Sequence, residues 1–118
     1  MTSESLKLAK RFLGQKVKVK IDRRLGEDHP RWPGHRYPCN YGFVPGTKAP
    51  DGQELDAYLL KVKKPVDSFE GVVVAIIHRL DNDDDKLIVV PEGEAISDSE
   101  IERMVEFQEK YFKHGIVR

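Results

Sequence analysis

The apolar run GVVVAIIHRL at residues 71–80 constrains the fold more than any other part of this sequence. It is rich in β-branched side chains and has no polar residue before His78. Such a run suits a strand that is buried on both faces. The run KLIVV at residues 86–90 follows after a short polar turn and is expected to pair with it. The two runs therefore predict the buried centre of a β-sheet.

Other segments have patterns that are typical of regular structure. Residues 16–21, KVKVKI, alternate strictly between lysine and apolar side chains, which predicts a strand with one buried face. Residues 55–62, LDAYLLKV, predict another strand, and residues 4–13 predict a short helix that Gly14 ends. Residues 22–40 contain three prolines and are expected to be irregular.

The clearest helix pattern lies near the end of the chain. Ser97 followed by Glu100 forms a capping box, which marks a helix start, and Gly115 is expected to end the helix. The apolar side chains that share one face at helical spacing are Ile101, Met104, Val105, Tyr111 and Phe112. A short helix, several strands and one C-terminal helix, in this order, predict a small barrel or a strongly bent sheet with a helix against it.

The overall charge argues against one class of function. Twenty basic residues balance twenty acidic residues, so the formal net charge is zero. Proteins that bind the phosphates of nucleic acids carry a basic excess, so we expect no nucleic-acid partner. The charge is nevertheless segregated, because residues 1–25 hold eight basic residues against two acids, and residues 92–109 hold seven acids against one arginine. These segments could attract each other or a second subunit of a homo-oligomer, or form two solvated faces.

Length and cysteine content indicate the setting of the protein. A chain of 118 residues suits one modest core, so residues 1–118 are expected to form a single domain. Cys39 is the only cysteine, which rules out an intrachain disulfide and favours a reducing, cytoplasmic location. No apolar run reaches membrane-spanning length and the charged N-terminal segment lacks a signal-peptide core, so we expect no membrane partner.

The segment DGQELD at residues 51–56 is the first candidate for a metal site. Asp51 lies in a turn where Gly52 permits unusual backbone angles, and Asp56 lies on the strand face opposite Leu55. Carboxylates that converge from such positions suit a hard divalent cation. An Asp-Gly turn that leads into a strand explains the same pattern without a ligand, so both interpretations stay open.

The segment DNDDDK at residues 81–86 is the second candidate. Its alternating aspartates are similar in spacing to a helix-flanked calcium loop, but Lys86 stands where that loop needs glycine and the flanks are predicted strands. A polar hairpin tip explains the segment. A bound cation would relieve the repulsion between its four carboxylates.

Four short runs then carry a resemblance to a known family. YPCNYGF, DGQELD, DNDDDK and FQEKYF occur in this order between about residues 16 and 113. Together they resemble the soluble family I inorganic pyrophosphatases. The resemblance implies a mainly β fold with α, an OB-like five-stranded β-barrel with a C-terminal helix packed on it. It also implies Mg²⁺ as cofactor, with Mn²⁺ as an alternative, and hydrolysis of pyrophosphate to two phosphates by a metal-activated water.

The resemblance assigns roles to individual residues. It implies that Tyr41 lies beside the attacking water and that Lys86 and Tyr111 bind phosphate. It implies that one aspartate is shared by two ions and serves catalysis directly, namely Asp56. The implied metal ligands are Asp51, Asp56, Asp81 and Asp84.

Three positions depart from the family pattern. Gln53 stands in place of an aspartate that accepts a proton from the attacking water, and an amide cannot do this near neutral pH. Lys20 stands where an acid is usual, and Phe112 stands where a phosphate-binding lysine is usual. We hypothesise that Lys20 replaces the charge of a lost metal. The family hairpin that carries another lysine, a glutamate and an arginine has no clear counterpart here. We further hypothesise that either Arg23 and Arg24, or Arg31 and Arg36, replace its cationic groups, with Arg23 as a candidate substrate-binding residue.

These departures leave several functions open. The protein hydrolyses pyrophosphate, or it is a phosphohydrolase for another small diphosphate or nucleotide, or it binds a metal and a phosphorylated ligand without turnover. A barrel that binds oligonucleotides through the basic residues 16–24 is the weakest alternative, because the net charge is zero and the turns are acidic.

Overall fold

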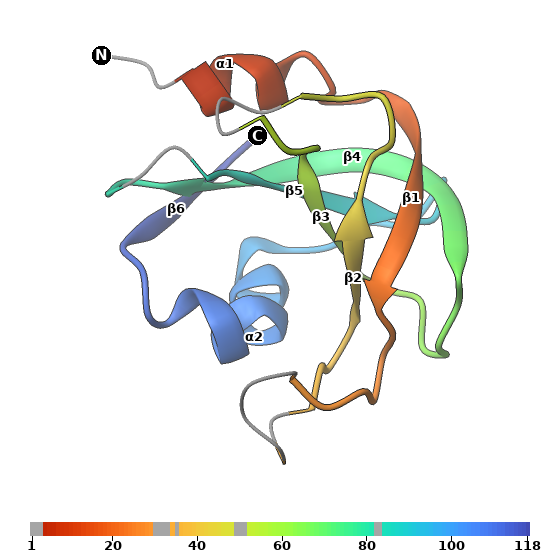
Figure 1. The fold of residues 1–118 in the computed structure, drawn as a ribbon. Helices are drawn as coiled ribbons and strands as arrows, with labels where there is room; N and C mark the ends of the chain where they lie inside the picture. The colour runs from red at the N-terminus through yellow and green to blue at the C-terminus, as the bar shows by residue number, and fades with distance from the viewer. Residues whose placement is uncertain (1–3, 30–33, 35, 49–51, 82–83) are drawn as a thin grey trace.

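The structure is a computed structural model that describes residues 4–29, 34, 36–48, 52–81 and 84–118. Within these residues it contains six strands and two helices (Figure 1). In chain order they are α1 (Glu4–Lys10), β1 (Lys16–Arg23), β2 (Asn40–Phe43), β3 (Asp56–Leu59), β4 (Ser68–Arg79), β5 (Lys86–Val90), α2 (Asp98–Glu109) and β6 (His114–Val117). Neither of the helices described is long and apolar enough to cross a membrane.

Five of the strands described close into a barrel. They pair in the order β1-β2-β3-β5-β4, and β4 pairs again with β1, which completes the circle. The β3–β5 pairing is parallel and the other pairings of the barrel are antiparallel. β6 then pairs with the far end of β4. The expected OB-like five-stranded barrel is confirmed, with β6 as an addition to it.

The length of β4 makes this closure possible. Residues 68–72 of this 12-residue strand pair with β1, and residues 76–79 pair with β6. A bulge between Val73 and Ala75 bends the strand between these two halves. At Gly71 an added Cβ would come 2.5 Å from a backbone oxygen of β5, so only glycine lets the strands approach this closely.

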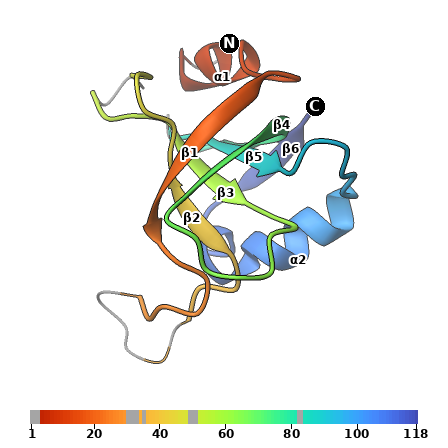
Figure 2. The same ribbon diagram turned by 90° about the vertical axis from the view of Figure 1, so that its right-hand side faces the viewer.

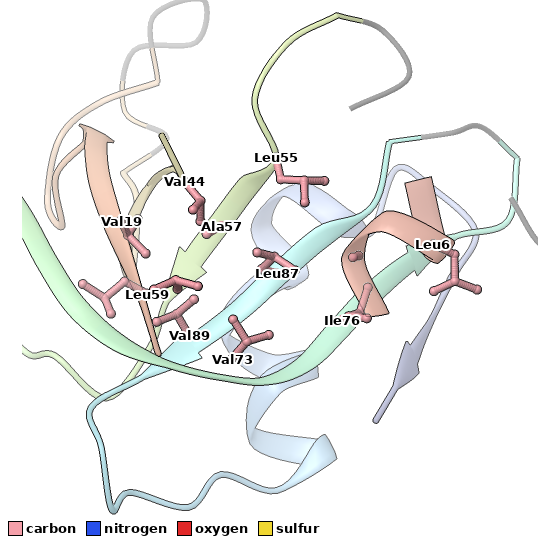
Figure 3. Close-up of a cluster of buried hydrophobic side chains, with 12 residues drawn as sticks. Leu6, Val19, Val44, Leu55, Ala57, Leu59, Val73, Ile76, Leu87 and Val89 are labelled. Atoms are coloured by element: carbon pink, nitrogen blue, oxygen red, sulfur yellow. The ribbon is translucent and has the colours of Figure 1, made fainter. Parts of the chain in front are cut away.

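The barrel interior is an apolar core that α1 closes at one end (Figures 2 and 3). Val17 and Val19 point into it while the lysines of β1 are exposed, as the alternating pattern predicts. Figure 3 shows Leu6 of α1 and Ile76 of β4 at the end of this core that α1 covers. The buried members of this core are Leu6, Ala9, Val17, Val19, Val44, Leu55, Ala57, Leu59, Val73, Ile76, Leu87 and Val89.

A second core lies on the outer face of the barrel, under α2. Leu87 and Val89 of β5 point into the barrel, whereas Ile88 and Val90 point outward against α2. β4 is divided in the same way, because Val73 and Ile76 belong to the inner core and Ala75 and Ile77 to the second core. The predicted burial of the run at residues 71–80 on both faces is therefore confirmed along the middle of β4. The buried members of the second core are Cys39, Tyr58, Leu60, Ala75, Ile77, Ile88, Val90, Ile96, Ile101 and Val105.

The start of α2 follows the sequence prediction, but its end does not. The Ser97 side chain caps the helix and accepts a hydrogen bond from the backbone of Glu100 at 3.2 Å. The helix ends at Glu109, because the chain must turn there to bring β6 alongside β4. Tyr111 and Phe112 therefore lie beyond the helix, and Tyr111 is 64% exposed, so the predicted place of both on the apolar helix face is wrong. Gly115 lies within β6 and does not end the helix.

Strand boundaries were predicted unevenly. β5 has its predicted range, whereas β4 begins at Ser68 rather than at residue 71. The short strands β2 and β6 were not predicted. The segment 22–40, expected to be irregular, contains the end of β1 and an isolated bridge between Asp28 and Arg36.

Asn40, at the start of β2, ties two loops to the barrel. Its side chain is fully buried and accepts hydrogen bonds from the backbone N–H groups of Leu25 at 2.9 Å and Val66 at 3.3 Å. It also donates to the carbonyl oxygen of Lys64 at 2.9 Å. The asparagine of the YPCNYGF run is thus a structural residue that satisfies buried backbone groups.

We expect Gly42→Ala to lower the free energy of unfolding by about 1–3 kcal/mol. An added Cβ at Gly42 would lie 1.9 Å from the backbone oxygen of Lys20, so β1 and β2 would have to separate. Gly115→Ala is the matched control, because a Cβ at Gly115 meets no atom within 4 Å. Urea denaturation of both variants checks the prediction, which fails if the two lose equal stability.

Candidate active site

Three strands bring charged residues to one rim of the barrel. Asp56 is the first residue of β3, Lys86 is the first residue of β5, and Arg79 is the last residue of β4. Asp56 lies beside Lys86 in the parallel register of β3 and β5. These side chains belong to the outer face of the barrel, which alternation along each strand separates from the inner core.

The Lys86 ammonium joins two carboxylates. Its Nζ donates to Oδ2 of Asp56 at 2.7 Å and to Oδ1 of Asp84 at 3.0 Å. Lys86 is 3% exposed, while Asp56 and Asp84 are partly exposed. Two carboxylates thus approach one ammonium group near the protein surface. Water screens the attraction between these charges only in part.

Arg79 extends this network to α2. Its Nη1 donates to Oδ2 of Asp84 at 3.1 Å, so Asp84 is shared between two cations. Its Nε and Nη2 donate to the two carboxylate oxygens of Glu109 at 3.0 and 2.9 Å. The Arg79 guanidinium also lies over the ring of Phe112, with Cζ 3.8 Å from the ring centroid. Strand, hairpin loop and helix end are therefore linked through one arginine.

The neighbouring Asp85 shapes the hairpin loop. Its carboxylate is buried and accepts a hydrogen bond from the backbone N–H of Arg79 at 2.9 Å. It also lies 3.1 Å from Nδ1 of His78. Asp84 thus binds the side chain of Arg79 and Asp85 binds its backbone, so these two acids are more than a solvated tip.

Aromatic residues form one wall of the site. The Tyr41 hydroxyl donates to Oδ2 of Asp56 at 2.9 Å, and the Tyr58 hydroxyl donates to Glu109 at 2.6 Å. Burial raises the pKa of both tyrosines well above the ordinary 10.0, and the nearby carboxylates raise it further. Both phenols therefore stay protonated and act as hydrogen-bond donors at neutral pH.

A cavity of about 360 Å³ opens beside these charges. Arg79, Lys86 and Asp84 line its polar side, and three aromatic side chains and Gln108 from the end of α2 and the following turn line the rest. His29, from the segment between β1 and β2, completes the wall and stacks on the ring of Tyr37. The aromatic residues from the end of α2 and the turn are Phe107, Tyr111 and Phe112.

The structure brings together many of the residues singled out in the sequence. Asp56, Asp84, Lys86 and Tyr41 are connected by hydrogen bonds, and Tyr111 lines the adjoining cavity. Asp51, the other predicted metal ligand of the DGQELD segment, lies outside the described residues.

Other predicted residues lie at the edges of this network. Lys20 is exposed on β1 and shares a cross-strand row with Asp56, one strand away through Phe43. Arg23 lies beside Tyr41 in the β1–β2 register. Asp81 is exposed in the loop after β4. Among the residues that the structure describes, no hydrogen bond or ion pair joins these three side chains to Asp56 or Asp84.

Sequence reasoning missed Arg79 and Glu109. The signal for Glu109 was present, because Ile101, Val105 and Glu109 follow each other at four-residue spacing and all are buried. An acid on the buried face of a helix needs a partner. The partner was also visible as Arg79, a charged residue at the end of an apolar strand.

Asp22 is a further acid near the site that was missed. It lies at a register shift between β1 and β2, which changes the direction of side chains there. Partial burial raises its pKa, and the charge of Asp56 raises it further. Asp22 therefore lies near enough to Asp56 to share its electrostatic environment.

The donors fit a divalent cation in part. Asp56 and Asp84 offer carboxylate oxygens on either side of one ammonium, which is the oxygen chemistry that Mg²⁺ prefers. Among the residues described, no three His, Cys, Asp or Glu side chains form a group that could hold a metal. Asp51 lies outside that search, so the two carboxylates form the part of a cation site that can be described.

Fold and site together define a class of protein, the OB-like barrels that carry paired carboxylates and basic side chains on one rim. The chain belongs to the inorganic pyrophosphatase family, because the profile of that family, described as inorganic pyrophosphatase, matches residues 11–115.

Individual proteins agree with this assignment. The chain is 35% identical over 80 residues to an inorganic pyrophosphatase of Aeropyrum pernix, which is 64% of this chain and 42% of that protein. It is 35% identical over 89 residues to one of Methanosarcina acetivorans, which is 70% of this chain and 48% of that protein. The chain thus spans a little under half the length of these curated relatives.

Solved structures agree on the fold. An inorganic pyrophosphatase of Coxiella burnetii superposes with a TM-score of 0.61 and 26% identity, over 81% of this chain and 76% of that chain. One from Ehrlichia chaffeensis superposes with a TM-score of 0.65 and 20% identity, over 86% of this chain and 84% of that chain. At 20% identity the second likeness concerns the fold alone.

We expect stability to depend on the ionised form of Glu109. Burial raises the pKa of Glu109, but hydrogen bonds from Arg79 and Tyr58 outweigh burial and hold the pKa below its ordinary 4.5. A pKa that is lower in the folded state contributes stability above about pH 4.5, and this stability is lost as the pH falls through the folded pKa. Denaturation measured between pH 7 and pH 3 should show this loss.

Glu109→Gln should remove that part of the pH dependence and lower stability at pH 7 by roughly 3–5 kcal/mol, because Arg79 then loses its buried carboxylate partner and keeps only the partly exposed Asp84. Glu106→Gln, an exposed acid of the same helix, is the control and should behave like the wild type. Equal stability of both variants at pH 7 would contradict the role given to the buried pair.

Proposed function

We propose that the protein hydrolyses inorganic pyrophosphate to two phosphates in a Mg²⁺-dependent reaction, with Mn²⁺ as an alternative ion. One observation carries the proposal: Lys86 lies between the carboxylates of Asp56 and Asp84 at 2.7 and 3.0 Å, beside a cavity. A site for metal-complexed pyrophosphate needs acids for the ion and cations for the phosphates at such short range. Membership of the inorganic pyrophosphatase family supports the same function.

In this proposal the acids hold the ion. Asp56 and Asp84 supply carboxylate oxygens, and Asp51 and Asp81 complete the set. A bound Mg²⁺ would lower the pKa of the attacking water and neutralise charge on the phosphates. The Tyr41 hydroxyl donates to Asp56 and so keeps that carboxylate in one orientation. Asp56 and Tyr41 are therefore the proposed catalytic residues.

The cationic groups bind the substrate. Lys86 provides a fixed positive charge, and the Tyr111 hydroxyl donates from the rim of the cavity. Lys20 and Arg23 are proposed to attract the anion from the β1 side, where Lys20 is exposed. Gln53 is exposed in the loop before β3, and its amide cannot accept a proton from water near neutral pH. We therefore expect slow turnover.

The cavity favours a second candidate function. Its volume of about 360 Å³ is larger than a small, fully charged anion requires, and such an anion has no need of an aromatic wall. Phe107, Tyr111 and Phe112 could contact a planar organic group while the cations bind its phosphates. This supports a phosphohydrolase for another small diphosphate or nucleotide as the alternative to pyrophosphate hydrolysis.

The setting of this activity is part of the proposal. We propose that residues 1–118 act as a single domain in the cytoplasm, without a nucleic-acid or membrane partner. A homo-oligomer is compatible with the segregated charge of the two ends of the chain.

We expect phosphate release from pyrophosphate in the presence of Mg²⁺, and also with Mn²⁺. Asp56→Asn should lower the rate about a hundredfold or more, because it removes a ligand and its charge. Gln53→Asp should raise the rate by about tenfold or more, because it supplies a proton acceptor. A phosphate assay with a panel of nucleoside diphosphates and triphosphates measures all three effects.

Asp98→Asn is the matched control, because Asp98 is an exposed acid that pairs with Arg118 at the start of α2. The proposal fails if pyrophosphate is not hydrolysed by the wild type. Hydrolysis of a nucleotide instead would establish the second candidate, and binding of pyrophosphate without hydrolysis would establish a non-catalytic protein.

A further inference from the structure

We infer that Arg79 is an anion-binding residue of the cavity. Glu109 and Phe112 hold its guanidinium in place, and Asp84 masks the guanidinium in the absence of a cation. The ligand it would take is the oxyanion of a phosphate or diphosphate group. The inference deepens the proposed function and rests on it for the identity of the ligand. It concerns binding, so it can be tested without turnover.

Arg79 combines burial with access to the cavity. Its side chain is 5% exposed, yet it lines the cavity together with Lys86. A guanidinium in such a place is costly unless it is paired, and its pKa keeps it charged at every relevant pH. It is therefore a permanent positive charge beside the cavity wall.

Two contacts fix the orientation of this charge. Glu109, itself fully buried, accepts hydrogen bonds from Nε and Nη2 of Arg79 at 3.0 and 2.9 Å, which defines the plane of the guanidinium. The Phe112 ring covers one face, with its centroid 3.8 Å from Cζ. The plane and one edge of the guanidinium are thus set by protein groups, and the Nη1 side is left for another partner.

Asp84 is that partner, and it is also the most exposed member of the network. It accepts from Nη1 of Arg79 at 3.1 Å and from Nζ of Lys86 at 3.0 Å. Its side chain is 43% exposed, against 5% for Arg79 and 3% for Lys86. The acid can turn toward solvent, whereas the two cations cannot follow it.

Movement of Asp84 would leave two fixed donors beside one cavity. Nη1 of Arg79 and Nζ of Lys86 would then lack one acidic partner each. Phosphate oxygens match such a pair, because they accept several charge-assisted hydrogen bonds at once and carry more than one negative charge. Acetate or chloride would satisfy the pair less well.

This arrangement couples cation and anion binding. A divalent cation that recruits the Asp84 carboxylate withdraws it from Arg79 and Lys86, and an anion on these two residues releases Asp84 for a cation. By linkage each ligand then favours the other by the same factor. Asp84 is thus the residue that keeps the anion site closed when no cation is present.

Asp84→Asn tests the inference by removing the negative charge that masks the site, because a neutral amide holds Arg79 and Lys86 less strongly than a carboxylate does. In metal-free buffer, calorimetry should show that this variant binds methylenediphosphonate, a diphosphate analogue whose P–C–P bridge is not hydrolysed, about tenfold or more tightly than the wild type. Asp98→Asn removes the same charge and the carboxylate partner of Arg118 at the start of α2, and neither residue lines the cavity, so this variant should bind like the wild type.

Arg79→Lys, added to Asp84→Asn, separates a directed guanidinium from charge alone. Lysine keeps the positive charge but loses the planar fork, so the double variant should lose most of the gain. Thermal unfolding of each variant confirms that it is folded. The inference is overturned if Asp84→Asn binds no tighter than Asp98→Asn, or if the double variant keeps the full gain. A protein that binds in this way but releases no phosphate from pyrophosphate would contradict the proposed function alone.

Discussion

The buried ion pair between Arg79 and Glu109 is the interaction on which the site depends. It joins the last residue of β4 to the last residue of α2, so it fixes the helix against the barrel where the cavity opens. Two charges that leave water need good geometry and further hydrogen bonds, and both are present, because the carboxylate accepts twice from Arg79 and once from Tyr58. The pair therefore serves to position the end of α2 and the Arg79 guanidinium, and it is not a large net source of stability. It holds Arg79 at the cavity, and through Arg79 it holds Asp84.

Much of the barrel could be predicted from the sequence, because its strands carry strong local patterns. The strict alternation of β1 and the apolar run of β4 fixed which faces are buried, and the resemblance supplied the closed topology. The strands β2 and β6 have four residues each and owe their pairing to neighbours that are distant in the chain, so no local pattern marks them. The end of α2 was misjudged for a similar reason, because the return of the chain toward β4 overrides the helical spacing of Tyr111.

The candidate site shows the same division. Asp56, Asp84, Lys86 and Tyr41 could be named from their motifs, and they do meet at one rim. The partners of these residues could not be predicted. A motif shows which side chains occur, but it does not show which cations form hydrogen bonds with the same carboxylate. Phe112 illustrates the difference. In the sequence it stands where the family has a phosphate-binding lysine, so a positive charge is missing. In the structure its ring lies against the guanidinium of Arg79, a cation at the end of β4.

In the proposed function, Lys86 and a divalent cation compete for the carboxylates of Asp56 and Asp84. The most direct measurement is the affinity for Mg²⁺, by calorimetry in the absence of any phosphate, of the wild type and of Lys86→Met, which keeps the length of the side chain and removes its charge. We expect Mg²⁺ to bind the wild type and to bind Lys86→Met about tenfold or more tightly, because two carboxylates then lack their internal counter-ion. Equal or weaker Mg²⁺ binding by a folded Lys86→Met variant would contradict a competition between Lys86 and the cation.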